Sequence, residues 1–126
     1  MLYLLKYPVI IFILVVIPIM LFAEGGKSED ENERKKIHYL LDKIEESGTI
    51  FERNGSEYSS KEAREHLELK LQRGAKYAKT AEDFINNLAS KSSVSGKSYK
   101  MKFSDGTEVK SGDWLYEQLN GFENKN

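Results

Sequence analysis

The sequence predicts a small α+β fold, built in the order helix, hairpin, helix, helix, hairpin, helix. Two observations carry this prediction. Apolar residues recur at the i, i+3, i+4 and i+7 spacing of amphipathic helices, and short alternating stretches around turn residues interrupt them. The chain has 126 residues and no internal repeat of roughly 20–50 residues, so we expect one folded domain, over residues 34–120.

The first 23 residues have the layout of a secretory signal peptide. Lys6 is followed by the uncharged stretch Pro8–Phe22, whose 15 residues fall short of the about 20 that a membrane-spanning helix needs. Ala23 is the small residue expected before a cleavage site, so we expect cleavage between Ala23 and Glu24 and a periplasmic location. The alternative is an uncleaved anchor in the inner membrane, with the domain facing the periplasm.

The composition excludes several classes of protein. Cysteine is absent, which rules out lipidation on cysteine, disulfides and thiolate metal sites. Without the signal peptide the chain has 18 basic and 20 acidic side chains, a formal charge of −2. A nucleic-acid-binding domain is expected to be net basic, so we expect no nucleic acid among its partners.

The first helix is predicted over residues 33–47. Residues 24–33 before it are rich in Gly, Ser and acids without apolar periodicity, which predicts a flexible lead-in. Gly48 is suited to a left-handed helix stop. The apolar face of this helix is predicted to consist of Ile37, Leu40, Leu41 and Ile44.

The first hairpin is predicted over residues 49–58. Asn54-Gly55 is a dipeptide that favours a two-residue turn, here between Ile50–Arg53 and Ser56–Tyr58. This turn fixes the pairing of the two strands.

The predicted register produces one favourable and one unfavourable pair across the first hairpin. Phe51 faces Tyr58, an aromatic pair that anchors one face of the hairpin. Glu52 faces Glu57, and we expect this like-charge pair to be tolerated only if both carboxylates reach water.

Two further helices are predicted from their capping residues. Ser59 has Glu62 three residues later, the spacing of a capping box, and starts a helix over residues 61–73. Thr80 caps another helix over residues 81–89 in a similar way. Their buried faces are predicted to consist of Ala63, Leu67 and Leu71 in the first, and Ala81, Phe84, Ile85 and Leu88 in the second.

A second hairpin and a last helix complete the predicted domain. Tyr99–Phe103 alternates apolar and basic residues like a strand with one wet face, and Glu108–Lys110 returns beside it. Ser111 is expected to cap the last helix. Residues 121–126 are expected to form a polar tail. The inner face of the last helix is predicted to consist of Trp114, Leu115 and Leu119.

Familiar catalytic motifs are missing from the sequence. It contains neither Gly-x-Ser-x-Gly nor His-Glu-x-x-His. His38 and His66 lie on different predicted helices, so we interpret them as surface or structural residues and expect no metal and no cofactor. Gly96-Lys97-Ser98 lacks the earlier glycine of a phosphate loop and leads from helix to strand, so we expect no nucleotide.

An acid-pair enzyme remains the alternative function, a small cell-envelope hydrolase acting through carboxylates or His66. Two carboxylates at a suitable separation are sufficient for glycoside hydrolysis. The candidate carboxylates are Glu62, Glu65, Glu82, Asp83 and Asp105. Most of them already have a structural explanation at a helix start or in a turn.

The hydroxyl-rich segment Ser90–Ser98 is predicted to form part of a contact surface. Its hydroxyls and lysines suit a carboxylate, a phosphate or an exposed backbone edge, although the same hydroxyls can instead form local bonds that shape the loop. The predicted contact residues are His66, Lys70, Ser92, Ser93 and Lys97.

The leading functional hypothesis is a non-enzymatic module that binds a periplasmic protein, a peptide or an envelope component. It follows from the export signal, the missing catalytic motifs and the hydroxyl-rich segment. A structural protein without a ligand is a third interpretation.

Several short motifs also occur together in a characteristic order. They are Phe51 with Arg53-Asn54-Gly55, then Glu62-Ala63, His66-Leu67, Lys70-Leu71, Thr80-Ala81-Glu82-Asp83-Phe84-Ile85, Ala89-Ser90, Ser92-Ser93, Gly96-Lys97 and Tyr99. In this combination the chain resembles the YfeK-like family, small exported bacterial proteins with a domain of unknown function. The resemblance implies a periplasmic location, but no reaction, cofactor or catalytic residue.

Overall fold

The computed structural model describes residues 29–125. The predicted signal peptide, its cleavage site and residues 24–28 of the predicted lead-in lie outside the described residues. The chain divides into two compact units, Met1–Asn32 and Glu33–Asn126. Within residues 29–125, no helix combines the length and apolar character needed to cross a membrane.

The lead-in predicted for residues 24–33 is wrong in its last part, because residues 29–33 are helical. Apolar periodicity is not required for a helical turn. Glutamate has a good helix propensity, and acids near a helix N-terminus interact favourably with the helix dipole. In the second unit Glu33 also accepts a hydrogen bond from the backbone N–H of Ala81 at 2.8 Å.

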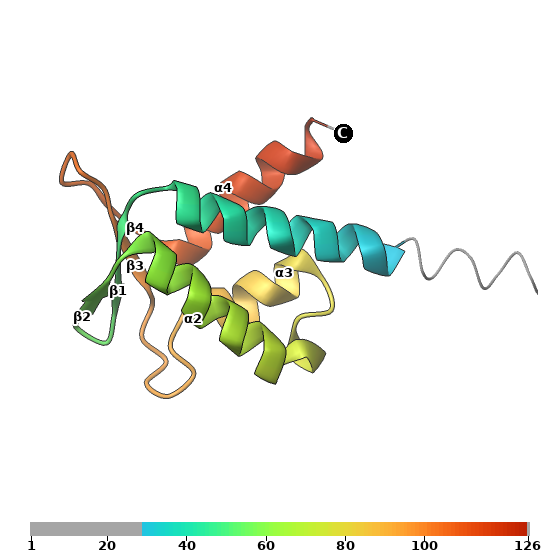
Figure 1. Ribbon diagram of the computed structural model, residues 1–126, viewed down its shortest axis with the longest axis horizontal. Helices are drawn as coiled ribbons and strands as arrows, with labels where there is room; N and C mark the ends of the chain where they lie inside the picture. The colour runs from blue at the N-terminus through green and yellow to red at the C-terminus, as the bar shows by residue number, and fades with distance from the viewer. Residues whose placement is uncertain (1–28, 126) are drawn as a thin grey trace, which may run out of the picture. The chain divides into compact units, whose positions relative to one another are not determined.

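The second unit is a small α+β domain, as predicted, with four helices and a four-stranded antiparallel sheet among the described residues (Figure 1). The first helix ends at residue 46. The elements that follow are β1 Ile50–Arg53, β2 Ser56–Tyr58, α2 Ser60–Arg73, the 3₁₀ turn η1 Ala75–Tyr77, α3 Ala81–Phe84 continuing into the π-helical turn η2 Ile85–Ala89, β3 Lys100–Lys102, β4 Glu108–Lys110 and α4 Ser111–Glu123.

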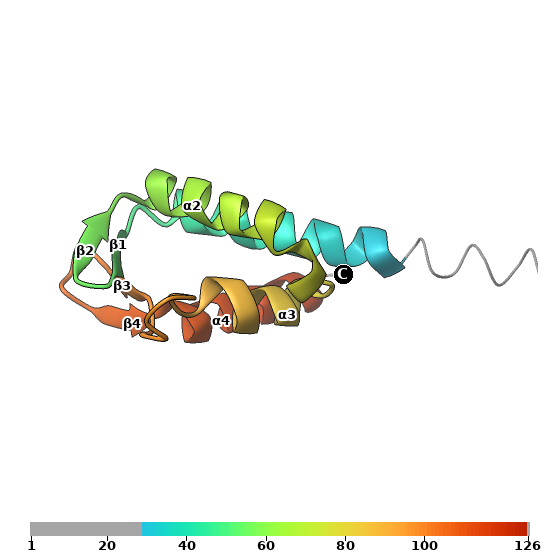
Figure 2. The same ribbon diagram turned by 90° about the horizontal axis from the view of Figure 1, so that it is seen from below.

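The two predicted hairpins join into one sheet with the order β2-β1-β3-β4. Strands β1 and β3 pair antiparallel, with Phe51 opposite Met101. Both side chains are buried, so this central pair turns one face of the sheet toward the core. Figure 2 shows the sheet at one end of the helices of this unit.

The register predicted for the first hairpin is confirmed, with Phe51 opposite Tyr58 and Glu52 opposite Glu57. Asn54 and Gly55 both have positive φ, 51° and 82°, as a tight two-residue turn of this kind requires. The expectation that the two glutamates need water is incomplete. Lys102 on β3 places its Nζ 3.1 Å from Glu52 and 3.0 Å from Glu57, so a lysine of the next strand offsets their repulsion.

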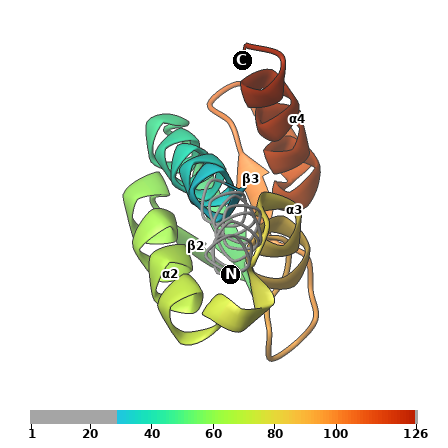
Figure 3. The same ribbon diagram turned by 90° about the vertical axis from the view of Figure 1, so that its right-hand side faces the viewer.

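The helices of the second unit form two layers around the core. The first helix lies beside α2, and α3 lies beside α4 (Figures 2 and 3). The predicted apolar faces are buried, apart from Leu71 and Trp114, which are partly buried and pack against the core. The core consists of Ile37, Leu40, Leu41, Ile44, Phe51, Ala63, Leu67, Ala78, Ala81, Phe84, Ile85, Leu88, Ala89, Tyr99, Met101, Leu115 and Leu119.

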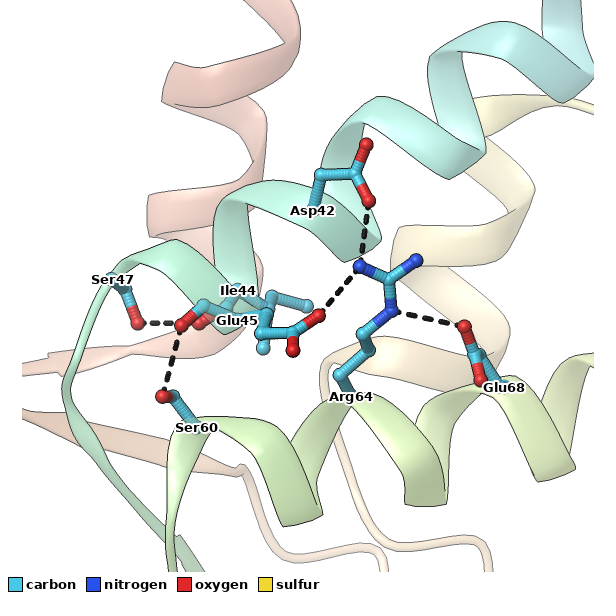
Figure 4. Close-up of polar contacts among 7 residues, drawn as sticks. All are labelled: Asp42, Ile44, Glu45, Ser47, Ser60, Arg64 and Glu68. Carbon is cyan, nitrogen blue, oxygen red and sulfur yellow. Dashed lines mark hydrogen bonds and ion pairs between the residues drawn. The ribbon is translucent and has the colours of Figure 1, made fainter.

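Arg64 connects α2 to the first helix (Figure 4). Its guanidinium lies 2.6 Å from Asp42 and 2.7 Å from Glu45 of that helix, and 2.9 Å from Glu68 one turn along α2. These carboxylates raise the pKa of Arg64, Glu68 most. Ser60 adds a hydrogen bond from its hydroxyl to the Glu45 carbonyl at 3.0 Å, so the start of α2 is held at the end of the first helix.

Two predictions for the last helix are wrong. Ser111 does not cap it, because its side chain is fully buried and donates a hydrogen bond to the Ala89 carbonyl at 2.8 Å. The helix also continues to Glu123, where a polar tail was expected from residue 121. The ring of Phe122 contacts that of Tyr39 on the first helix, with centroids 4.9 Å apart, so packing between helices extends α4 past Gly121.

Candidate functional site

A pocket of about 380 Å³ lies between β1, α2 and the hydroxyl-rich segment. We call it the basic pocket, because its lining contains four basic side chains and neither Asp nor Glu. It is lined by Arg53, His66, Lys70, Arg73, Gly74, Tyr77, Leu88, Ser92, Ser93, Val94 and Tyr99. Residues from three separate parts of the chain therefore converge on one concave surface.

The cations of the basic pocket come from two elements. Lys70 and Arg73 are three residues apart on α2 and so lie on the same side of the helix, while Arg53 ends β1. Among residues 29–125, no carboxylate lies within 4.0 Å of these three side chains. The pocket thus combines positive charge with the absence of an internal counter-ion in the described part of the chain.

Arg53 contacts the imidazole of His66. Its Nη1 lies 2.9 Å from Nε2 and 3.2 Å from Nδ1 of the ring. Since a guanidinium can only donate, the ring nitrogen that accepts is unprotonated. Burial, followed by the charges of Arg53 and Lys70, lowers the pKa of His66, which favours the neutral imidazole.

Lys70 is held by two oxygen atoms and an aromatic ring. Its Nζ donates to the Lys91 carbonyl at 3.2 Å and lies 3.1 Å from the hydroxyl of Tyr99 and 5.1 Å from the centre of that ring. Burial and the nearby charge of Arg53 lower the pKa of Lys70 to about 8. Burial raises the pKa of Tyr99, so this phenol stays protonated.

Ser92 fixes the hydroxyl-rich segment in place. Its side chain is buried and accepts hydrogen bonds from Asn54 Nδ2 at 3.1 Å and from the backbone N–H groups of Val94 and Ser95, both at 3.3 Å. Ser95 in turn donates to Asn54 Oδ1 and accepts from the Lys97 N–H. The interpretation that these hydroxyls shape the loop therefore holds for Ser92 and Ser95.

The structure brings four of the five predicted contact residues to the basic pocket. His66, Lys70, Ser92 and Ser93 all line it, and Lys97 does not. Lys97 is exposed, and its backbone takes part in the turn that Ser92 and Ser95 hold.

Sequence reasoning missed Arg53, Arg73 and Tyr99 as residues of the pocket. Arg73 carried a usable signal, since it follows Lys70 by three residues and His66 by seven, which places all three on one helix face. Arg53 carried no such signal, because its approach to His66 depends on how the hairpin docks on α2.

A second hollow of about 330 Å³ adjoins the basic pocket. We call it the apolar hollow, and it shares Arg53, His66 and Tyr99 with the basic pocket. Its other lining residues are Phe51, Tyr58, Ala63, Leu67 and Leu69, which are aromatic or aliphatic, and the acids Glu62 and Glu65.

The candidate carboxylates do not gather in one place. Glu62 and Glu65 line the apolar hollow, whereas Glu82 and Asp83 lie in the first turn of α3 and Asp105 lies in the turn of the second hairpin. The backbone N–H of Thr107 donates to Asp105 and lowers its pKa. His38 is exposed on the first helix, and residues 29–125 hold no cluster of three or more His, Asp or Glu that could bind a metal ion.

Comparison with known proteins places the chain in a family. Residues 31–123 match the family described as "Family of unknown function (DUF5329)". The chain belongs to the DUF5329 family. It is also similar to "Uncharacterized protein YfeK" of Salmonella typhimurium, at 33% identity over 85 residues that cover 67% of this chain and 71% of that protein. No solved structure matches.

The DUF5329 match contains the whole site. It extends over both hairpins, α2 and the hydroxyl-rich segment, and so includes every residue of the basic pocket and the apolar hollow. The similarity to YfeK confirms the resemblance seen in the sequence motifs. The DUF5329 match, residues 31–123, extends beyond the predicted domain, 34–120, by three residues at each end.

Proposed function

We propose that this DUF5329 protein is a non-enzymatic binding module of the bacterial cell envelope, and that its basic pocket holds an anionic group of its partner. One observation carries the proposal. Three cationic side chains, Arg53, Lys70 and Arg73, line a single concave surface in which neither Asp nor Glu takes part. A carboxylate or a phosphate is the group that such a surface fits.

The energetics of the cations favour an anionic ligand. Lys70 is half-buried with only neutral oxygens and a ring for partners, and removal of a cation from water without a counter-ion is unfavourable. A bound anion would supply the missing charge. Arg53 and Arg73 add planar guanidinium groups, whose paired donors match carboxylate and phosphate oxygens.

The same geometry makes the hydrolase alternative less favourable. A histidine acting as general base is usually oriented by a carboxylate, but the neighbours of His66 are Arg53 and the ring of Tyr99. Glu62 accepts a hydrogen bond from the Ser59 N–H as part of the capping box of α2. The side chains around His66 therefore suit holding charge better than proton transfer.

Two observations support a location in the cell envelope. The first 23 residues have the layout of an export signal. The YfeK-like motifs resemble those of exported bacterial proteins. A periplasmic protein, a peptide or an envelope component could each present the anionic group.

A titration with inorganic phosphate, followed by backbone amide NMR, tests the anion site. We expect the amides of residues 53, 66, 70 and 92–94 to shift most, and Arg53→Gln or Lys70→Met to weaken binding about tenfold. Lys100→Gln is the matched control, because it removes one positive charge from an exposed position on β3. An equal loss of phosphate affinity in Lys100→Gln would mean that net charge alone weakens binding. It would contradict the proposal that the basic pocket binds the anion.

Cell fractionation with mass spectrometry of the N-terminus tests the location. A chain beginning at Glu24 in the periplasm supports the proposal. A membrane-bound chain that still carries Met1 supports the anchored alternative, and a cytosolic chain carrying Met1 contradicts export.

A further inference from the structure

We infer that the ligand is a short peptide with a free carboxyl terminus and an apolar last residue, its carboxylate in the basic pocket and its last side chain in the apolar hollow. This inference rests on the proposed function and names its ligand class. It depends on how the two hollows adjoin.

The two hollows meet at three shared residues, Arg53, His66 and Tyr99. A ligand bound there must therefore carry its anionic group and its apolar group close together. The last residue of a peptide meets this requirement, because its carboxylate and its side chain are attached to the same carbon atom. Arg53, which lines both hollows, is placed to contact the carboxylate.

The apolar hollow is suited to one side chain. Its wall includes the buried rings of Phe51 and Tyr99 and the side chain of Leu69, which is 41% exposed although it is aliphatic. Covering such a surface with an apolar group is favourable. The volume of about 330 Å³ lies at the lower end of the roughly 300–1,000 Å³ typical of ligand pockets, so the hollow has room for one aromatic or aliphatic side chain and part of the peptide backbone beside it.

The charges around the two hollows also favour a peptide over a fatty acid. Cations line the basic pocket, and Glu62 and Glu65 line the apolar hollow. The amide N–H groups or the free amine of a peptide can donate to these carboxylates. An acyl chain has no hydrogen-bond donor for these carboxylates. A peptide, which carries both a carboxylate and N–H donors, therefore matches the charges of the two hollows better.

Isothermal titration calorimetry of the purified protein with the dipeptide Ala-Phe tests the inference. We expect Ala-Phe to bind about tenfold more tightly than Ala-Ala, which lacks the ring, and than Ala-Phe amide, which lacks the carboxylate. Octanoate is the comparison for an acyl chain, and we expect it to bind more weakly than Ala-Phe.

Leu69→Ala separates this inference from the anion site. It should weaken Ala-Phe severalfold and leave inorganic phosphate binding unchanged, since Leu69 lines only the apolar hollow. Ile50→Ala is the matched control, because Ile50 is also 41% exposed and lines neither hollow, and it should change neither affinity.

The outcomes distinguish the two proposals. If phosphate binds in the basic pocket but Ala-Phe binds no more tightly than Ala-Ala or its own amide, the peptide inference is wrong and the anion site stands. If octanoate binds more tightly than Ala-Phe, the peptide inference is wrong and the ligand class is an acyl chain with a carboxylate. If neither phosphate nor Ala-Phe binds, both proposals are wrong.

Discussion

Arg53 and His66 are in direct contact, with Nη1 of the arginine 2.9 Å from Nε2 of the histidine. The contact joins the end of β1 to the middle of α2 at the place where the basic pocket and the apolar hollow meet. It holds only while the accepting ring nitrogen is unprotonated, since a guanidinium cannot accept a hydrogen bond. The protonation of His66 is therefore linked to the shape of the site.

The first prediction concerns the pKa of His66. Burial, followed by the charges of Arg53 and Lys70, lowers this pKa. Arg53→Gln removes one of the two charges and should raise the pKa of His66 toward the ordinary histidine value, with burial keeping it below. Histidine ring resonances followed by NMR against pH measure the shift.

Lys100→Gln provides the control for this titration. Lys100→Gln removes a charge from an exposed position that does not line the pocket and should leave the His66 curve in place. A pKa of His66 that is the same with and without Arg53 would contradict the interaction.

The second prediction concerns Ser92. Its buried hydroxyl accepts from Asn54, Val94 and Ser95, so Ser92→Ala leaves these three donors without that acceptor. We expect a loss of about 1–2 kcal/mol in the free energy of unfolding and faster amide hydrogen exchange at Val94 and Ser95. Chemical denaturation and exchange measured by NMR check both.

Ser93→Ala is the matched control for Ser92→Ala. Ser93 is exposed and lies next in the chain, so its replacement should leave stability and exchange unchanged. It is also the better variant for probing ligand contact, since it leaves the loop intact. Equal effects of the two substitutions would mean that Ser92 does not hold the segment.

Local sequence signals predicted most elements of the fold because those elements depend on neighbouring residues. The Asn54-Gly55 turn fixed the register of the first hairpin, and the Ser59 capping box fixed the start of α2. The joining of β1 to β3 was not predictable in this way, because Phe51 and Met101 are far apart in the chain. The role of Ser111 was not predicted either, because its partner, the Ala89 carbonyl, lies 22 positions earlier in the chain.

The candidate site was predicted only in part, for the same physical reason. His66 and Lys70 share a helix face, which a helical period reveals. Their encounter with Ser92 and Ser93 was a hypothesis from residue chemistry, and it depends on tertiary packing. The contribution of Arg53 arises from the docking of a hairpin on a helix, which no local pattern encodes.

The third prediction concerns Lys102, which holds three glutamates near one another. Its Nζ lies 3.1 Å from Glu52, 3.0 Å from Glu57 and 3.6 Å from Glu108, and hydrogen bonds to Glu57 and Glu52 raise its pKa. Lys102→Met leaves Glu52 and Glu57 directly opposite each other without the bridging cation. We expect a lower melting temperature, and a larger drop at low salt than at high salt, because salt screens the repulsion.

Two further variants isolate the charge effect of Lys102. Glu57→Gln in the Lys102→Met background should recover part of the lost stability, since it removes one member of the like-charge pair. Lys79→Met removes an exposed lysine outside the sheet and should cause little change. If Lys102→Met lowers stability equally at all salt concentrations and Glu57→Gln recovers nothing, the side chain acts through packing instead.

The last prediction is a pH dependence of stability that Lys70 causes. Its pKa in the folded protein is about 8, below the ordinary lysine value of 10.5. The unfolded chain therefore binds more protons than the folded one between about pH 8 and pH 10.5, so the contribution of Lys70 to the free energy of unfolding rises with pH in that window. Below about pH 8 both states are protonated, and the burial of the charge opposes folding by a constant amount.

The difference in unfolding free energy between the wild-type protein and Lys70→Met isolates this contribution from the other groups that titrate in the same range. We expect it to shift in favour of the wild type by about 1–2 kcal/mol from pH 8 to pH 10.5, less than the full shift in pKa implies because Lys70 is only half-buried. Urea denaturation at several pH values measures it. Phosphate that binds the protonated Lys70 should raise the pKa of Lys70 and so move this pH window upward. If saturating phosphate leaves the pH window unchanged, the anion does not bind at Lys70.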